Sequence, residues 1–109
     1  MRAILVSLLA AASLILLAGC KNPPKMSLDE FQEFCNDEFG YAEDCDSGPI
    51  CSGYAQAVSR QFQGVKDCVA ACNAQDKAYW MENVMTDCAA VVGNATDWCD
   101  QYCRRKYQQ

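Results

Sequence analysis

The chain has 109 residues, nine of them cysteine and none histidine, and its formal net charge is −5 at pH 7. This acidic balance argues against nucleic acid as a partner, because phosphate backbones are bound by clusters of Lys and Arg. The lack of histidine removes the most common general base and metal ligand of enzymes. The length suits one small domain.

The N-terminal segment has the composition of an export signal. Arg2 precedes a run from Ala3 to Leu17 that is almost wholly Ala, Leu, Ile and Val, and this order is typical of a secretory signal peptide. The run is shorter than the about 20 apolar residues that a transmembrane helix needs. It ends in Leu17-Ala18-Gly19-Cys20.

This ending resembles the lipobox of bacterial lipoproteins. The resemblance implies that residues 1–19 are removed and that the thiol of Cys20 is acylated. An ordinary cleaved signal peptide and a plain membrane anchor with a fortuitous Cys20 are the alternatives. Lys21 follows the cysteine, whereas Asp at that position commonly retains lipoproteins of enteric bacteria in the inner membrane. By that family rule we expect an outer-membrane location, facing the periplasm.

Residues 20–27 form a tether between the lipidated cysteine and a helical domain at residues 28–109. The tether contains Pro23 and Pro24, and Pro-rich segments extend by about 3.1 Å per residue. We therefore expect the tether to hold the domain within ~25 Å of the bilayer.

The cysteine count supports lipidation of Cys20, because an odd number otherwise leaves an unpaired thiol. An even set in an oxidising compartment predicts four disulfides, which a domain poor in Leu and Ile needs for stability. Zinc binding is disfavoured, since the chain has no histidine and no C-x₂-C pair. The eight cysteines expected in disulfides are Cys35, Cys45, Cys51, Cys68, Cys72, Cys88, Cys99 and Cys103.

Amphipathic patterns predict an all-α fold, a small disulfide-stapled bundle of about four helices. Ser27 and Glu30 form a capping box for a first helix that runs from Leu28 to Phe39 and ends at Gly40. A loop is expected over residues 41–50. The three later helices are expected near residues 53–73, 77–92 and 97–107, with Ser52, Asp76 and Thr96 as their caps, Asn73 closing the first and Gly93 the second.

Two C-x₃-C motifs place cysteine pairs on helix faces, because residues i and i+4 lie on one side of a helix. If the helices that carry them are parallel, the pairs are Cys68–Cys99 and Cys72–Cys103. If they are antiparallel, the pairs are Cys68–Cys103 and Cys72–Cys99. The short connections favour the parallel arrangement. The other four cysteines would then tie the first helix and its loop to the third helix.

An acidic surface is predicted on the first helix and its loop. Eight of the fourteen acidic residues lie between Asp29 and Asp46, and no Lys or Arg occurs from Met26 to Ser59. We expect this surface to bind a basic envelope protein; the alternative is a solvated face. The net charge also argues against docking on an anionic surface, which leaves the lipid as the anchor. The predicted acidic surface of the protein is centred on Glu33, Asp37, Glu38, Glu43, Asp44 and Asp46.

Together these features predict a non-enzymatic interaction module without catalytic residues or a cofactor, such as an inhibitor, an immunity-type protein or a receptor-masking lipoprotein. The alternative is a periplasmic thiol–disulfide oxidoreductase or assembly chaperone that uses the C-x₃-C pairs. It is disfavoured because Asp67 adjoins Cys68 and a nearby carboxylate opposes a thiolate. The aromatic residues are expected mainly in the core, with binding anchors as the alternative: Tyr79, Trp80, Trp98 and Tyr102.

Overall fold

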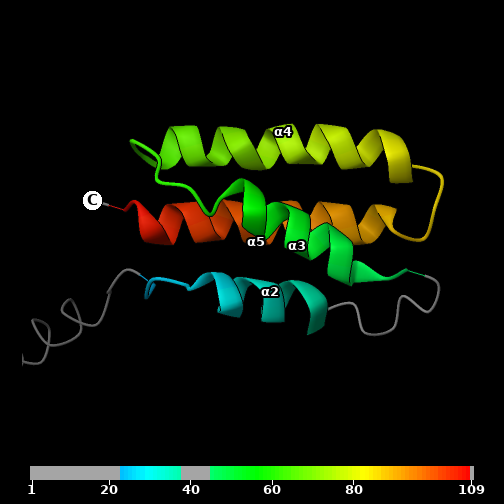
Figure 1. Cartoon of the computed structure of the whole chain (residues 1–109), viewed down its shortest axis with the longest axis horizontal. Helices are drawn as coiled ribbons and strands as arrows, with labels where there is room; N and C mark the ends of the chain where they lie inside the picture. The colour runs from blue at the N-terminus through cyan, green and yellow to red at the C-terminus, as the bar shows by residue number, and fades with distance from the viewer. Residues whose placement is uncertain (1–22, 38–44, 109) are drawn as a thin grey trace, which may run out of the picture.

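Four helices make up the described part of the chain, residues 23–37 and 45–108, in a computed structural model. Within those residues there is no strand, and each helix runs antiparallel to the next (Figure 1). The predicted all-α, disulfide-stapled bundle is confirmed. The helices are α2 (Leu28–Asp37), α3 (Ser47–Ala57), α4 (Val65–Asn83) and α5 (Ala89–Lys106).

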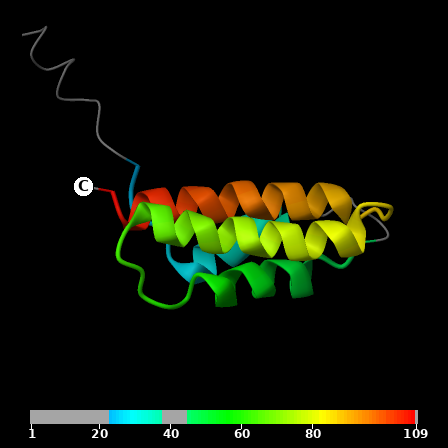
Figure 2. The ribbon, with the colours of Figure 1, turned by 90° about the horizontal axis from the view of Figure 1, so that it is seen from above.

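The helices form two packed pairs, α4 with α5 and α2 with α3. α4 and α5 lie side by side along their length (Figure 2). α3 also contacts both α4 and α5, and α2 contacts α5. Among the described residues, α2 and α4 do not contact each other.

The antiparallel order gives the bundle two distinct ends (Figure 1). At the end where residue 23 enters, the side-chain amide of Gln108 donates to the Pro23 carbonyl at 3.0 Å. At the other end, the Cys45–Cys88 disulfide ties the start of α3 to the α4–α5 turn. We define the tether end as residues 23–31, 58–69 and 100–108, and the far end as residues 34–37, 45–50 and 80–91.

The first helix begins as predicted. The Glu30 amide donates to Ser27 Oγ at 3.1 Å, and the Ser27 amide donates to Glu30 Oε1 at 3.4 Å. This reciprocal pair is the predicted capping box. The described part of α2 ends at Asp37; the expected stop at Gly40 and the remainder of the expected loop up to Asp44 lie outside the described residues.

The predicted loop over residues 41–50 is wrong at its end, because α3 begins at Ser47. Asp46 is the N-cap, and its carboxylate accepts from the Gly48 amide at 3.1 Å. Pro49 does not prevent this start, because Pro is tolerated in the first helical turn, where the amide needs no partner within the helix. Ser52, the expected cap, lies inside α3.

The predicted helix over residues 53–73 is also wrong, since it is divided between α3 and α4. α4 starts after Gly64, whose extended backbone serves as the N-cap. Phe62, in the connection, is buried: its amide donates to the Tyr107 hydroxyl at 3.0 Å and the two rings meet edge-on. This tertiary contact accounts for the break, which helical periodicity does not reveal.

The predicted helices over residues 77–92 and 97–107 are shifted. Asn73 and Asp76 lie inside α4, and Gly93 and Thr96 lie inside α5. The real break is the turn at residues 84–88, where the Thr86 hydroxyl accepts from the Cys88 amide at 3.2 Å. A glycine inside a helix costs about 1 kcal/mol relative to Ala, and the buried valines and alanine around Gly93 outweigh that cost.

The structure corrects the favoured cysteine pairing. α4 and α5 form an antiparallel hairpin with no helix between them, so the pairs are Cys68–Cys103 and Cys72–Cys99. The other four cysteines were expected to tie the first helix and its loop to the third helix. Cys45–Cys88 agrees with this, because it joins the expected loop to a residue of the expected third helix. Cys35–Cys51 does not, because it joins α2 to α3.

A hydrogen-bonded network links α3, α4 and α5 in the interior. The Tyr54 hydroxyl lies 2.6 Å from Thr96 Oγ1, and Thr96 in turn can donate to Asp76 Oδ1 at 3.1 Å. Burial raises the pKa of Tyr54 to about 12, with smaller contributions from its neighbours. The phenol is therefore protonated at neutral pH and can donate to Thr96. Thr96, expected as a helix cap, instead connects three helices.

A glycine allows α3 and α4 to approach closely at this network. Gly53 lies in α3, and a Cβ there would overlap the phenol of Tyr79, whose Cζ would be only 2.9 Å away. Tyr79 has little room to move, because its ring packs on that of Tyr54 with centroids 5.7 Å apart. By contrast, a Cβ at Gly93 in α5 would meet nothing within 4 Å.

We therefore expect Gly53→Ala to lower the free energy of unfolding by about 1–3 kcal/mol, as overpacking does. Gly93→Ala, the matched control, should raise it by up to about 1 kcal/mol through helix propensity. Guanidinium unfolding with the disulfides intact measures both. Equal stabilisation by the two substitutions would show that Tyr79 does not require Gly53.

Candidate partner-binding surfaces

The structure tests only part of the predicted acidic surface. Glu38, Glu43 and Asp44 lie outside the described residues. Glu33 and Asp37 are exposed one turn apart on α2. Asp46 is exposed as well, although its carboxylate caps α3.

A hydrogen bond brings the acidic end of α2 to the start of α3. Ser47 Oγ donates to Asn36 Oδ1 at 2.7 Å, so that Asp37 and Asp46, the neighbours of these two residues, reach the same end of the bundle. The far end therefore combines these carboxylates with those of Glu82 and Asp87, both exposed. The described residues of the far end contain no Lys or Arg.

An exposed apolar cluster lies at the far end, where α4 finishes. Trp80 is 46% exposed, Met81 78%, Val84 42% and Met85 92%. Trp80 and Val84 are one turn apart at the end of α4, and Met81 and Met85 follow them along the chain, so the four side chains are exposed at the same end of the bundle. We call these four residues the α4 apolar cluster. Glu82 and Asp87 are its charged neighbours along the chain.

The expectation that these aromatic residues lie mainly in the core is confirmed for three of the four and is wrong for Trp80. Tyr102 is buried, and Tyr79 and Trp98 are half-buried against the core. Trp98 also stacks on Phe34, with ring centroids 4.9 Å apart. Only Trp80 of the four expected residues is well exposed. The sequence offered a signal for its position, because Trp80-Met81 and Val84-Met85 place two apolar pairs in an otherwise polar stretch.

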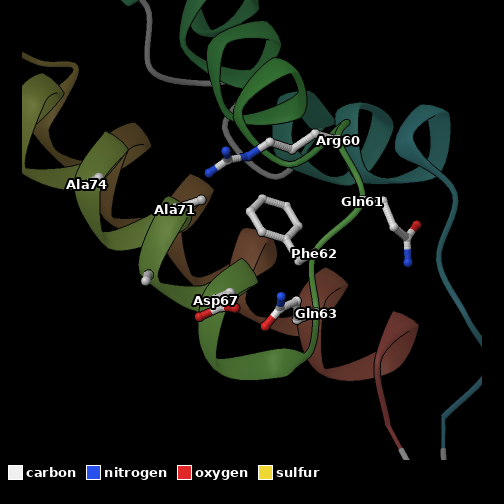
Figure 3. Close-up of a pocket in the computed structure, with 8 residues that line it drawn as sticks. Arg60, Gln61, Phe62, Gln63, Asp67, Ala71 and Ala74 are labelled. Atoms are coloured by element: carbon white, nitrogen blue, oxygen red, sulfur yellow. The ribbon is translucent and has the colours of Figure 1, made fainter.

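A separate hollow of about 560 Å³ lies between the α3–α4 connection and α4 (Figure 3). The Arg60 guanidinium lies over the Phe62 ring, 4.7 Å from its centroid. Asp67 is the other charged residue in its wall, and alanines of α4 complete it. The wall provides a cation, a carboxylate and two amides, which suits weak polar binding more than nucleophilic chemistry.

The cysteines of the two C-x₃-C motifs lie close together in the interior. Cys72 Sγ and Cys103 Sγ, from different disulfides, are 3.6 Å apart, and Cys99 Sγ lies within 4.8 Å of both. These sulfur atoms are disulfide-bonded, whereas zinc is bound by thiolates. All four cysteines of this group are fully buried, so a partner's thiol has no direct access to them.

Comparison with models of known protein families, with curated proteins and with solved structures finds no match to this chain. Among residues 23–37 and 45–108, no helix is long and apolar enough to cross a membrane. Cys20, the expected lipidation site, lies outside this range.

The different exposure of the disulfides predicts the order in which they are reduced. Cys45–Cys88 is partly exposed, whereas the six cysteines of the other three disulfides are fully buried. Under a graded reductant without denaturant, we expect Cys45 and Cys88 to become alkylated first, because thiolate attack needs access to sulfur. Peptide mapping after alkylation identifies the modified residues.

The other three pairs should react only when the bundle unfolds. Early alkylation of Cys72 or Cys99 in the folded protein would contradict this order and would favour the oxidoreductase alternative.

Proposed function

We propose that this chain is a lipid-anchored protein of the bacterial cell envelope, and that it acts as a non-enzymatic interaction module. The lipobox-like sequence Leu17–Cys20 supports the anchor. Four disulfides account for the other eight cysteines, and Cys20 is then the one thiol left for acylation. Lys21 after the cysteine supports an outer-membrane location that faces the periplasm.

The two ends of the bundle then have different roles. Residue 23 lies at the tether end, beside Gln108, so an acyl chain on Cys20 would hold this end near the bilayer. α4 has 19 residues and spans about 28 Å at 1.5 Å per residue. The far end is therefore presented away from the membrane, where an envelope protein can reach it.

The α4 apolar cluster is the observation that carries the proposed binding function. Trp and Met are enriched in protein interfaces relative to other surfaces, and Met side chains adapt their shape to a partner. Burying apolar surface gives about 25 cal/mol per Å², so four large exposed side chains at one site favour association. Trp80 is the expected anchor, because tryptophan dominates interface energetics.

The charge around the cluster indicates the class of partner. Glu82 and Asp87 are its neighbours along the chain, Asp37 and Asp46 are exposed at the same end of the bundle, and the described far end contains no Lys or Arg. A partner with basic residues around an apolar pocket fits this surface, and opposite charge would speed its association. An envelope toxin or cell-wall hydrolase neutralised by this protein, or a masked receptor, satisfies that description.

The second candidate function is the thiol–disulfide oxidoreductase or assembly chaperone. The C-x₃-C pairs favour it, because Cys72 and Cys103 from adjacent disulfides approach to 3.6 Å and could exchange. Their complete burial disfavours it, since exchange with a client requires an accessible sulfur. We therefore place it after the interaction module.

The anchor is tested by substitution of Cys20. We expect Cys20→Ser to abolish palmitate incorporation in cells, because serine has no thiol for the lipid to be attached to. Residues 1–19 should be absent from the wild-type mature protein by mass spectrometry. The double variant Cys45→Ser/Cys88→Ser is the matched control and should keep the label. Wild-type protein that retains residues 1–19 and takes up no palmitate would contradict the anchor.

Binding through the cluster is tested by site-specific photocrosslinking in whole cells. A photoreactive residue at Met81 or Met85 should give an adduct with one basic envelope protein. The same residue at Ala74, exposed earlier on α4, should not give it. Trp80→Ala should weaken binding to the purified partner by about 30-fold, the effect of losing about 2 kcal/mol at an interface hot spot.

Binding measurements with the purified partner also test whether the acidic residues beside the cluster speed association. Glu82→Lys/Asp87→Lys should slow association most at low salt. If the Ala74 position gives the same adducts as Met81, or Trp80→Ala binds as tightly as wild type, the cluster is not the binding site.

A further inference from the structure

The cationic side chains gather at the end opposite the α4 apolar cluster. The described chain contains seven Lys and Arg residues, and six of them belong to the tether end. Four acidic residues share that end, namely Asp29, Glu30, Asp67 and Asp100. The far end has four acidic residues and no cation. The six cations are Lys25, Arg60, Lys66, Arg104, Arg105 and Lys106.

Because of this separation, the net charge of the whole chain does not describe the charge at either end. The chain as a whole is acidic, and on that basis docking on an anionic surface was not expected. The antiparallel helices, however, bring together cations that are far apart in sequence: the tether, the α3–α4 connection and the end of α5 meet at one end (Figure 2). The charge that a surface meets depends on which end faces it.

Neighbouring aromatic rings hold two of these cations in place. Lys106 Nζ donates to the Tyr102 hydroxyl at 3.1 Å and lies 5.5 Å from the Tyr102 and Tyr107 ring centroids. The hydrogen bond to Tyr102 raises the pKa of Lys106, which keeps it charged. Arg60 lies over Phe62 in the same way.

Two hollows flank Arg104 where the tether meets α5. One, of about 290 Å³, is lined by Pro23, Gln101, Arg104, Arg105 and Gln108. The other lies between α4 and α5 and includes Lys66. Arg104 pairs with Asp100 at 2.8 Å, whereas Arg105 donates to the neutral Gln101 at 3.0 Å. Arg105 therefore retains an uncompensated charge beside the tether.

The length of the tether brings this end within reach of lipid headgroups. Pro23 is three positions after Cys20, and three residue steps span at most about 10 Å. This distance is close to the screening length of ~8–10 Å at physiological ionic strength. If Cys20 is acylated, Arg104 and Arg105, which share a hollow with Pro23, lie within the electrostatic potential of the membrane surface.

We propose that the tether end docks on an anionic phospholipid surface, through Lys66, Arg104, Arg105 and Lys106. The docked bundle stands upright, with the α4 apolar cluster directed away from the bilayer. The inference rests on the proposed anchor only for bringing the protein to a membrane. Each Lys or Arg near such a surface strengthens membrane binding about fivefold.

Lysine labelling on vesicles tests this orientation. Lys66 and Lys77 both lie on α4, exposed, and eleven residues place them on the same face about 16 Å apart along the axis. The protein purified from envelopes is added to phosphatidylcholine vesicles, with or without one-third phosphatidylglycerol, and treated with a water-soluble amine reagent. We expect the anionic lipid to slow labelling of Lys66 at least threefold and to leave Lys77 unchanged. Salt at 1 M should remove the difference.

Substitutions identify the residues responsible. Arg104→Gln/Arg105→Gln should reduce the preference for phosphatidylglycerol vesicles about 25-fold in flotation, because two cations that each contribute about fivefold are lost. Lys77→Gln is the matched control and should not change it. Circular dichroism checks that both variants fold.

Flotation with vesicles of phosphatidylcholine alone depends on the acyl anchor and not on the cationic residues. Loss of the anchor is therefore distinguished from loss of the docking surface. If the protein floats only with the vesicles that contain phosphatidylglycerol, and salt abolishes this flotation, the docking surface is supported and the anchor is not. Equal labelling of Lys66 on both kinds of vesicle, or flotation with neither, would overturn the proposal. Protection of Lys66 only by an added acidic protein would assign the surface to that class of partner instead and would likewise overturn it.

Discussion

Two disulfides, Cys68–Cys103 and Cys72–Cys99, join α4 to α5 one helical turn apart, and the remaining structure packs on that hairpin. In the part of the chain that the structure describes, six of the seventeen buried apolar residues are cysteines, so covalent bonds occupy the positions that aliphatic side chains fill in larger domains. A disulfide contributes about 2–4 kcal/mol, mainly by restricting the unfolded chain. The hairpin thus provides a rigid surface for α3, and α2 is held in turn through Cys35–Cys51.

Because the helices are held together by these cross-links and contacts, the sequence predicted that the fold is helical but did not predict where most helices begin and end. The capping box of Ser27 and Glu30 is a local signal, and α2 begins where it indicates. Gly93 and Thr96 carry equally clear local signals for a helix boundary, yet both lie inside α5. There, contacts with other helices exceed the fraction of a kcal/mol that such residues contribute. Cysteine pairing followed from the hairpin and therefore could not be chosen before the α4–α5 turn was located.

The candidate binding surfaces, too, were predictable from the sequence only in part. The distribution of charge along the sequence predicted an acidic surface on the first helix and its loop, and Glu33, Asp37 and Asp46 are exposed. Exposure of Trp80 was not predictable from periodicity, because it depends on how far the other helices cover the last turn of α4, a property of helix length and stagger. The cationic end was missed for another reason. Lys25, Arg60 and Arg105 are distant in sequence, and only the antiparallel order of the helices makes them neighbours.

The Cys45–Cys88 disulfide also determines how the molecule would carry mechanical load. A partner bound at the α4–α5 turn and an anchor before residue 23 would pull on opposite ends of the bundle. The covalent route between them passes along α2 to Cys35, crosses to Cys51, follows the first turn of α3 back to Cys45 and crosses to Cys88. Force along this route stretches α2 and two disulfides, while the α4–α5 hairpin lies outside the loaded path. The interface could therefore bear tension without separation of the helices that form the core.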